Sequence, residues 1–323
     1  MIRKIVLALC MATLLLLGTG TAFGQCSWST KVVLSQTTSD QPGLATYTPA
    51  SGINTIYLMY VGTDSNRTLN AMESTNGTSW GSQTPLKGWQ SSHGVALAGA
   101  PPNSGGCPYL ITAWPNRSNN VLYAATSANG YQWSGPYSLT LSSTATPAIN
   151  PGNGDIAYQD PTTTMIAVMP ATCSLHYNPD NPPTWHFFGD AEGCPFPTDC
   201  TTTSSGSPAF PAPLAIAMGT NQPIWAQTYV SAFELPGGSN TYSGYGVTGT
   251  YIPSPGGSEL PTYYLAWRGG SGNINFWSSL SGLKVCSDTS NSAPAMTFFN
   301  GFLYVAWRSS SNNTINIASI GEF

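Results

Sequence analysis

A repeated pair of short segments is the feature that most restricts how this chain can fold. The first segment is small and marked by Pro or Gly, and its six copies centre on Pro42, Gly94, Pro147, Pro208, Gly246 and Pro294. The second is an apolar strand rich in Tyr and Trp, with clear copies at 56–60, 109–114, 263–267 and 303–307 and weaker ones at 155–158 and 214–218. Successive starts lie 52, 53, 61, 38 and 48 residues apart. This period predicts a β-propeller, whose blades run about 40–50 residues.

Each repeat divides into four expected strands, called A to D from the propeller axis outwards. The small segment is strand A and the Tyr/Trp segment is strand B. Strand C is expected at 69–73 and 121–126, and strand D from Trp80 and Trp133 onwards. Between C and D stand Asn76-Gly77 and Asn129-Gly130, a dipeptide typical of tight hairpins. Small A strands suit the crowded axis, and large B side chains suit the wider gaps between blades.

The two ends of the chain are expected to share one blade. The last repeat, which contains Trp307, supplies only strands A to C before the sequence ends at Phe323. The segment 28–34 matches 133–139 in the spacing of its residues and supplies the missing strand D. Closing a ring in this way removes two open sheet edges. The predicted fold is an all-β, six-bladed propeller of four-stranded antiparallel blades, closed by the N-terminal strand.

The stretch from about 173 to 207 is the least regular part. It is rich in Pro and Asn and contains Cys194 and Cys200, so we expect an insertion pinned by a disulfide. A ring of five or seven blades is an alternative. A jelly-roll sandwich is a weaker one, because it would not produce a period of about 50 residues.

The N-terminus is typical of a signal peptide. Arg3 and Lys4 precede an apolar run from Ile5 to Leu17, and small residues around Gly24 follow. The run of ~13 residues is shorter than the ~20 that a membrane-spanning helix needs. We therefore expect a signal peptide over 1–24 with cleavage after Gly24, a secreted or extracytoplasmic protein, and a single propeller domain over 25–323. A retained signal anchor is the alternative.

Charge and composition restrict the partners. Without the predicted signal peptide, seven basic residues face 13 acidic ones, so the basic footprint of a nucleic-acid-binding protein is absent. Charged residues make up 7% of the chain against about 25% in typical proteins. Hydroxyl and amide groups must provide solubility, as in turn-rich extracellular proteins. No later stretch is apolar and long enough to span a membrane, and we expect a monomer.

Cysteine usage agrees with export. Six cysteines follow the predicted signal peptide: Cys26, Cys107, Cys173, Cys194, Cys200 and Cys286. An even number in an exported chain predicts disulfides, but six cysteines allow about 15 pairings and the spacing selects none. The chain has three histidines and no C-x-x-C pair, so we expect neither a metal site nor a cofactor.

Two of the expected C–D turns resemble the Asp-box of sialidase-like (BNR-repeat) propellers. Residues 74–80 (STNGTSW) and 127–133 (SANGYQW) are similar to S-x-D-x-G-x-T-W, with Asn in place of Asp and one residue fewer. The resemblance covers two of the six repeats and implies the six-bladed architecture of that superfamily. The motif is structural there and implies no activity. The family's F/Y-R-I-P signature is absent, and 41–44 (QPGL) stands in its place.

Charged residues converge on one predicted face, the B–C face, which carries the B–C turns and the D–A loops. The arginines after the signal all fall at B–C turns: Arg67, Arg117, Arg268 and Arg308. Four acids are expected there, in B–C turns (Asp64, Asp160) and D–A loops (Asp40, Asp288). Arginine forks suit carboxylates, sulfates and sugars. Sugar-stacking candidates are Trp114, Trp267 and Trp307. The structural alternative is that the arginines pair with neighbouring blades and the tryptophans form inter-blade core.

Three functions follow, and none has an assigned catalytic residue. The first is a lectin-like module that binds glycans or another extracellular polymer through the B–C face. The second is a sialidase-like glycoside hydrolase, which needs two carboxyl groups ~5–9.5 Å apart. The third is a non-catalytic surface or protein-interaction scaffold. A hydrolase predicts acids and arginines around one central pocket. A repeat lectin predicts similar shallow sites between blades, and a scaffold predicts a flat face with paired arginines.

Overall fold

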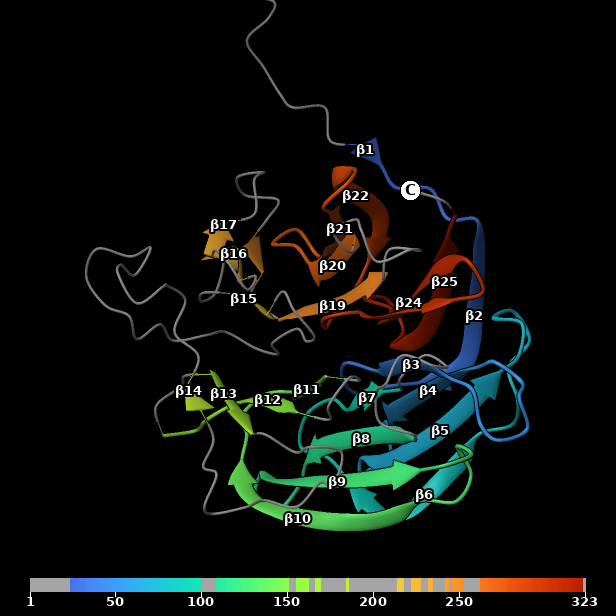
Figure 1. Cartoon of the computed structure of the whole chain (residues 1–323), viewed down its shortest axis with the longest axis vertical. Coiled ribbons are helices and arrows are strands. Elements are labelled where there is room, and N and C mark those ends of the chain that lie inside the picture. The colour runs from blue at the N-terminus through green and yellow to red at the C-terminus, as the bar shows by residue number, and fades with distance from the viewer. Residues whose placement is uncertain are drawn as a thin grey trace, which may run out of the picture.

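The computed structural model describes residues 24–99, 109–150, 155–162, 166–169, 184–185, 214–217, 222–227, 232–234, 242–243, 246–252 and 262–321. Their strands form six sheets, arranged as the blades of an all-β propeller (Figure 1). Sheets 1 to 6 are numbered by the chain order of their inner strands. Sheets 1, 2, 5 and 6 each contain an antiparallel four-stranded blade whose side chains the structure largely describes, and sheet 5 has one additional strand.

The first three sheets follow the chain in simple A-to-D order. Blade 1 holds β3 (Gly43–Tyr47), β4 (Thr55–Val61), β5 (Thr68–Ser74) and β6 (Thr84–Gln90). Blade 2 holds β7 (Ala96–Ala98), β8 (Leu110–Pro115), β9 (Val121–Ser127) and β10 (Ser134–Ser142). Sheet 3 holds β11 (Ala148–Ile149), β12 (Ile156–Gln159), β13 (Ile166–Met169) and β14 (Thr184–Trp185).

Of the other three sheets, blades 5 and 6 include strands of the N-terminal segment. Sheet 4 holds β15 (Leu214–Ala217), β16 (Gln222–Gln227), β17 (Ala232–Glu234) and β18 (Tyr242–Ser243). Blade 5 holds β19 (Val247–Ile252), β20 (Thr262–Arg268), β21 (Asn273–Ser278) and β22 (Gly282–Thr289), with β1 (Gly24–Gln25) on its outer edge. Blade 6 holds β23 (Ala295–Phe299), β24 (Phe302–Arg308), β25 (Thr314–Ile320) and the N-terminal β2 (Thr30–Thr37).

The N-terminal strand completes blade 6, as its spacing predicts. β2 pairs antiparallel with β25, with Thr30 opposite Ser319 and Val33 opposite Asn316. The strands β2 and β25 therefore lie side by side, blue against red in Figure 1. The sequence did not predict β1, which pairs in parallel with β22 of blade 5. The N-terminal segment thus contacts two blades in succession.

Two strand assignments from the sequence are wrong. Residues 214–218 were expected to form a B strand, but β15 is the first strand of sheet 4 and contacts the inner strand β19. The Trp-containing β16 occupies the B position instead. Strand D of blade 1 begins at Thr84, four residues after Trp80. The Asn-Gly pair therefore belongs to a wider C–D loop and not to a two-residue hairpin.

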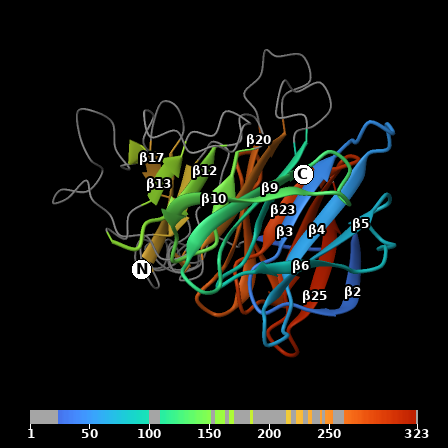
Figure 2. The same cartoon turned by 90° about the horizontal axis from the view of Figure 1, so that it is seen from below.

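Small residues on the A strands allow close approach at the axis, as expected. A Cβ atom on Gly43 would lie 2.8 Å from the carbonyl oxygen of Val95 on the neighbouring blade. The inner strands β23 and β3 lie side by side around this axis (Figure 2). The core consists of clusters between blades, such as Leu58 and Tyr60 of blade 1 with Ile315 and Ile317 of blade 6.

The Asn-Gly turns of blades 1 and 2 are built alike. Ser74 Oγ accepts the Gly77 N–H at 2.8 Å, and Asn76 Oδ1 accepts the N–H groups of Thr78 and Ser79. Gly77 has φ 75°, and the matching Gly130 has φ 79°, a region that favours glycine. Each turn packs on a tyrosine of the preceding blade, so the Asp-box-like motif has a structural role here.

The disulfide joins Cys26 to Cys286 with Cα atoms 4.7 Å apart. The other four expected disulfide partners, Cys107, Cys173, Cys194 and Cys200, lie outside the described residues. The predicted signal peptide before Gly24 also lies outside them, as does the predicted insertion at 173–207 except for β14. No helix among the described residues is long and apolar enough to cross a membrane.

Candidate functional site

A buried Ser or Thr stands at each described corner where strand D leads into the next blade. The four are Thr38, Ser91, Ser143 and Ser290, all fully buried. Their N–H groups donate to carbonyl oxygens in the B–C turn of their own blade, those of Asn313, Arg67, Asn120 and Gly272. Each of these acceptor residues has a positive φ, between 52° and 91°.

The residue after each corner connects to the following blade. Ser39 N–H donates to Val61 at 2.9 Å, and Thr144 N–H donates to Gln159 at 3.1 Å. The corner hydroxyls reinforce the link: Ser290 Oγ donates to the carbonyl oxygens of Ser292 and Arg308. Buried polar groups are costly unless they are hydrogen-bonded, and these corners satisfy them while joining adjacent blades.

Two of the predicted ligand-binding arginines hold these corners. Nε of Arg67 donates to the Ser91 carbonyl oxygen at 2.7 Å, and Nε of Arg268 donates to that of Ser290 at 2.6 Å. Arg67 also bonds Asp40 Oδ2 through Nη2 at 3.3 Å. The paired side chains are about a quarter exposed, 27% and 28%.

The other two arginines differ from each other. Arg308 donates from Nε to Asn313 Oδ1 at 2.9 Å and from Nη1 to the Ser39 carbonyl oxygen at 2.8 Å. Arg117 is exposed in the β8–β9 turn. Arg67, Arg268 and Arg308 therefore have structural partners at three different blade junctions and do not form one cluster.

Half-buried His93 lies near the Arg67–Asp40 pair. Burial lowers the pKa of its imidazole; the Asp40 carboxylate raises it and the Arg67 guanidinium lowers it further. The net shift of the pKa is downward, which favours the neutral imidazole. No group of three or more His, Cys, Asp or Glu side chains in the described part of the chain is placed to hold a metal ion.

The four predicted acids do not gather around one pocket. Asp64 caps its own B–C turn: it accepts the Thr68 N–H at 3.0 Å and the Thr68 hydroxyl at 2.8 Å. Asp160 accepts the Thr162 N–H at 2.8 Å in the β12–β13 turn. Asp288 was expected in a D–A loop, but it lies within β22 because that strand continues to Thr289.

The three predicted sugar-stacking tryptophans are core residues. Trp114, Trp267 and Trp307 are 1%, 0% and 1% exposed. Trp114 stacks on Trp89 with ring centroids 4.8 Å apart, and Trp307 stacks on Trp28 at 5.2 Å. Protein therefore covers their ring faces, which corrects the prediction that they form open sugar platforms.

A polar pocket of about 460 Å³ opens between blades 6 and 1. This Tyr60 pocket is lined by Tyr60, Gln36, Asp64, Asn70 and Gln83, with further Ser, Thr, Gly and Pro residues. Gln83 Nε2 donates to Asn70 Oδ1 at 2.7 Å. The hydroxyl of Tyr60 is buried without a hydrogen-bond partner among the described residues, and burial raises its pKa.

A second pocket of about 360 Å³ opens between blades 5 and 6. This Trp307 pocket is lined by Trp307, Asp288, Lys31, Asn316 and the turn residues 309–312, among others. Lys31 forms an ion pair with Asp288, and its Nζ lies 5.5 Å from the centroid of the Trp307 ring.

The two pockets occupy equivalent places in the repeat. Asn70 pairs with Pro85 in blade 1, and Asn316 pairs with Val33 in blade 6. This register aligns Gln83 with Lys31. Counting back from the corner residues aligns Gln36 with Asp288, each two residues before its corner. The buried B-strand aromatic is Tyr60 in one pocket and Trp307 in the other.

Two further interfaces have an apolar residue at the position of Gln36 and Asp288. At the interface of blades 1 and 2 the residue at this position is Trp89, which packs on Trp114. At the interface of blade 2 and sheet 3 it is Leu141, which packs in the cluster that contains Tyr158. The residue two places before the corner therefore separates the two polar pockets from the two packed interfaces.

Sequence reasoning identified part of this site. Asp64, Asp288 and Trp307 were candidates and line the pockets, whereas Tyr60, Gln36, Asn70, Gln83 and Lys31 were missed. The available signal was the alignment of D strands on their corner Ser or Thr, which exposes the change from apolar to polar residues two places earlier.

Comparison with known protein families finds no matching family, and comparison with curated proteins finds no match. Solved structures do match. The α-L-arabinanase of Penicillium chrysogenum complexed with arabinobiose is 13% identical over 91% of this chain and 98% of that chain, with a TM-score of 0.59.

Two other solved structures match over most of their length. AofleA from Arthrobotrys oligospora, in a variant with three arginines replaced by alanine, is 12% identical over 91% of each chain, with a TM-score of 0.56. The SapL1 lectin in complex with α-methyl fucoside is 12% identical over 85% of this chain and 90% of that chain, with a TM-score of 0.52. At such identities the similarity shows a shared propeller fold and nothing more specific.

Proposed function

We propose that this protein is a lectin-like propeller that binds saccharides in the polar pockets between its blades. One observation carries the proposal: the Tyr60 and Trp307 pockets recur at the same place in two successive interfaces. Similar sites between blades are what a repeat lectin predicts. Both volumes, about 460 and 360 Å³, fall in the range of about 300–1,000 Å³ typical of small-molecule sites.

The lining groups suit uncharged sugars. Hydroxyl and amide side chains form most of the polar surface of the Tyr60 pocket, and the unpaired Tyr60 hydroxyl offers a buried donor and acceptor. In the Trp307 pocket the positive charge of Lys31 is paired with Asp288. Neither pocket therefore presents an unpaired cation to an anionic sugar. Saccharide hydroxyls match this mixture of donors and acceptors.

The solved relatives of this fold support the proposal. The arabinanase was determined with arabinobiose and SapL1 with α-methyl fucoside, so two propellers of similar shape hold saccharides. The arabinanase name also suggests a glycosidase, which would need two carboxyl groups in one pocket. However, Asp64 and Asp288 line different pockets, and Asp40 lines neither. We infer binding without hydrolysis at these pockets.

The remaining architecture belongs to the same proposal. We infer a closed ring of six blades, supported by six sheets whose inner strands contact one another in the order β15, β19, β23, β3, β7, β11. We further infer export after cleavage behind Gly24, a single domain over 25–323 and a monomer. The relation to sialidase-like propellers is proposed to be architectural and is supported by the two Asn-Gly turns.

A glycan array probed with the purified chain tests the function. Gln36→Trp copies Trp89 and fills the Tyr60 pocket, whereas Asp288→Leu copies Leu141 and fills the Trp307 pocket. We expect selective binding by the wild type, a several-fold loss in each variant, and complete loss in the double variant. Lys87→Gln, on the exposed outer strand β6, is the control and should bind normally.

Two results would overturn the proposal. One is a folded wild-type protein that binds no glycan on the array. The other is binding that survives in the folded double variant, which would place the saccharide site elsewhere on the molecule.

A further inference from the structure

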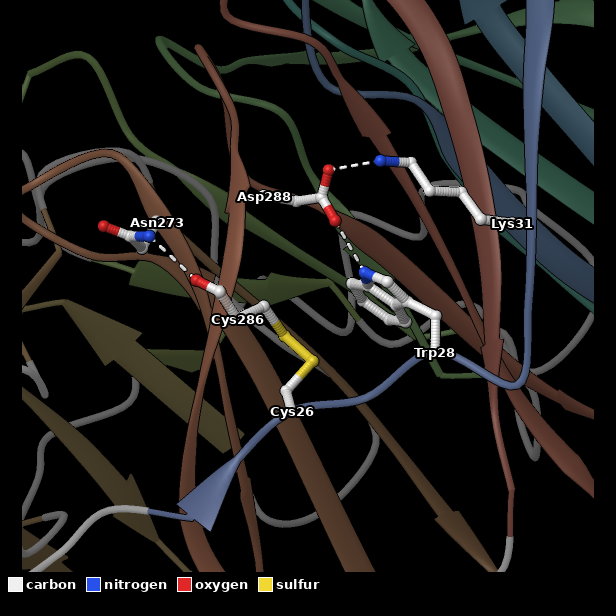
Figure 3. Close-up of a disulfide and its surroundings, with 6 residues drawn as sticks. All are labelled: Cys26, Trp28, Lys31, Asn273, Cys286 and Asp288. Atoms are coloured by element: carbon white, nitrogen blue, oxygen red, sulfur yellow. Dashed lines mark hydrogen bonds and ion pairs between the residues drawn. A yellow bond between two sulfur atoms is a disulfide. The ribbon is translucent and has the colours of Figure 1, made fainter.

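The N-terminal segment crosses from blade 5 to blade 6 beside the Trp307 pocket. Gly24 and Gln25 pair with Lys284 and Val285 of β22, and the Cys26 N–H donates to the Val285 carbonyl oxygen at 3.1 Å. Three residues later the Ser29 N–H donates to Ser319 of blade 6 at 2.8 Å. Figure 3 shows the segment passing from the disulfide to Lys31.

The Cys26–Cys286 disulfide fixes this crossing. It joins residues 260 positions apart, and both half-cystines are buried, at 9% and 1% exposure. The Asn273 amide donates to the Cys286 carbonyl oxygen at 2.8 Å, which holds that side of the bond within blade 5. The disulfide therefore attaches the entering chain to a strand that is itself well anchored.

Residues near both half-cystines lie at the Trp307 pocket: Asp288 and Lys31 line it, and Trp28 packs against Trp307 and Asp288. Trp28, two residues after Cys26, stacks on Trp307 at 5.2 Å and donates from Nε1 to Asp288 Oδ2 at 2.6 Å. Lys31 bonds the other carboxylate oxygen of Asp288. Both oxygens of Asp288 are thus held by residues of the N-terminal segment (Figure 3).

We propose that the Cys26–Cys286 disulfide positions Trp28, which in turn holds the pocket residues Asp288 and Trp307 for ligand binding, so that saccharide binding at the Trp307 pocket requires the oxidised protein. This inference rests on the proposed function. Once the bond is broken, the backbone contacts left between the mature segment and β22 are the pairing of Gln25 with Val285 and the hydrogen bond from the Cys26 N–H. Trp28 then loses its fixed place over Trp307, and Asp288 loses a donor.

The Tyr60 pocket does not depend on a disulfide, because the continuous chain of blade 1 holds the equivalent tryptophan in place. Its counterpart of Trp28 is Trp80, which stands between β5 and β6 of one continuous blade. Its counterpart of Cys286 is the buried Leu34. In blade 6 no C–D loop joins β25 to β2, because these are the last and first strands of that blade. The disulfide instead attaches the segment before β2 covalently to β22 of blade 5.

The chemical step is a two-electron reduction by a dithiol such as dithiothreitol. The Sγ–Sγ bond breaks, Cys26 and Cys286 each gain one electron and one proton, and the dithiol is oxidised to a cyclic disulfide. A Cys26→Ser/Cys286→Ser double variant reproduces the reduced state without the reagent.

The experiment measures the two pockets separately on the glycan array. In the Gln36→Trp background only the Trp307 pocket is open, and the double serine variant should bind at least tenfold more weakly. In the Asp288→Leu background only the Tyr60 pocket is open, and binding should change less than twofold. Trp28→Leu, with the disulfide intact, should reproduce the loss at the Trp307 pocket.

A second readout needs no ligand. With ¹⁵N-labelled tryptophan, the Trp28 indole N–H resonance should be protected from solvent exchange in the oxidised protein and lose that protection in the double serine variant. Unchanged protection together with unchanged binding overturns this inference while leaving the proposed function intact. Absence of binding by the oxidised wild type overturns the proposed function, and the resonance still reports whether the disulfide holds Trp28.

Discussion

The interface between blades 1 and 2 and the interface between blades 6 and 1 are built on the same plan but differ in one respect. Both have a buried aromatic at the end of strand B, Trp114 and Tyr60, and both have a Ser or Thr corner. Trp89 fills the space over Trp114, whereas Gln36 leaves a pocket of about 460 Å³ beside Tyr60. The comparison teaches that the fold tolerates either arrangement, and the proposed saccharide site lies where the packing is incomplete.

The opposite side of these interfaces shows no such difference. The Asn-Gly turn of blade 2 packs on Tyr57 of blade 1, and that of blade 1 packs on Tyr304 of blade 6. Tyr57 and Tyr304 contact the Asn129 and Asn76 carbonyl oxygens at 3.4 and 3.5 Å. The blades are therefore held together at one end, which leaves the B–C end free to vary.

The largest expected effect comes from the packed interface. Trp114→Ala removes a fully buried ring that stacks on Trp89 and leaves a cavity, so we expect a loss of about 3–5 kcal/mol in the free energy of unfolding. Tyr60→Ala should cost less, because its ring borders a pocket that water already reaches. Urea denaturation of both variants measures the difference. Equal losses would show that the two interfaces do not differ in packing.

The shared turns should respond alike in the two interfaces. A Cβ on Gly130 would lie 2.1 Å from Tyr57 Cε1, and one on Gly77 would lie 2.3 Å from the Tyr304 hydroxyl oxygen. With positive φ at both, alanine should cost about 2–3 kcal/mol at each site.

Gly52 is a matched control for these turns. Its φ is 78°, but a Cβ there would meet nothing within 4 Å. Gly52→Ala should therefore show the backbone strain alone, about 1 kcal/mol. Thermal unfolding of the three variants tests this, and a Gly77 variant no less stable than the Gly52 variant would contradict the docking of the turn.

Trp89→Gln would convert the packed interface towards the open one. Trp89 is only partly buried, so we expect a loss of about 1–2 kcal/mol in stability and a new polar pocket beside Trp114. Isothermal titration with a saccharide selected on the array should then give one more site per chain than the wild type. An unchanged number of sites would mean that a polar residue at this position is not sufficient for binding.

The sequence was informative where the pattern is periodic. The small A strands, the aromatic B strands and the D strand that closes blade 6 all follow the repeat of the blades. Each could therefore be predicted from the sequence without knowing how the blades pack. The Asn-Gly turns were found for the same reason. Their loops proved wider than a hairpin because the side chains of Ser74 and Asn76 organise them.

The pockets could not be read in the same way, because the D strands are irregular. Every D strand of the four described blades has a register shift against strand C near its end, between Val33 and Thr37 in β2 for example. A shift of one residue changes which side chains face the neighbouring blade. The alternation of residues along the strand therefore did not predict that Gln36 and Asp288 face the space between neighbouring blades. The disulfide pairing was equally hidden, since β1 had no counterpart in the repeat.

The smallest expected effect is a pH dependence of binding at the Tyr60 pocket that comes from Asp64. Burial alone would raise the pKa of Asp64, but hydrogen bonds from Thr68 and Asn66 outweigh burial and lower it. Ser311 takes the corresponding place in the turn of the Trp307 pocket and does not titrate. The folded-state pKa of Asp64 lies below its unfolded value, so its contribution is present above about pH 4. It is lost as the pH falls through the folded value.

Acidification below pH 4 should therefore weaken binding at the Tyr60 pocket by a few-fold, because protonated Asp64 holds its turn less firmly. Titrations of the Asp288→Leu and Gln36→Trp variants between pH 6 and pH 3 measure each pocket by itself. Asp64→Asn removes the titrating group, and its binding should be less dependent on pH over the same range. If binding by the Asp64→Asn variant remained fully sensitive to acid, the turn of the Tyr60 pocket would not depend on the charge of Asp64. The two pockets would then differ only in the residues that line them.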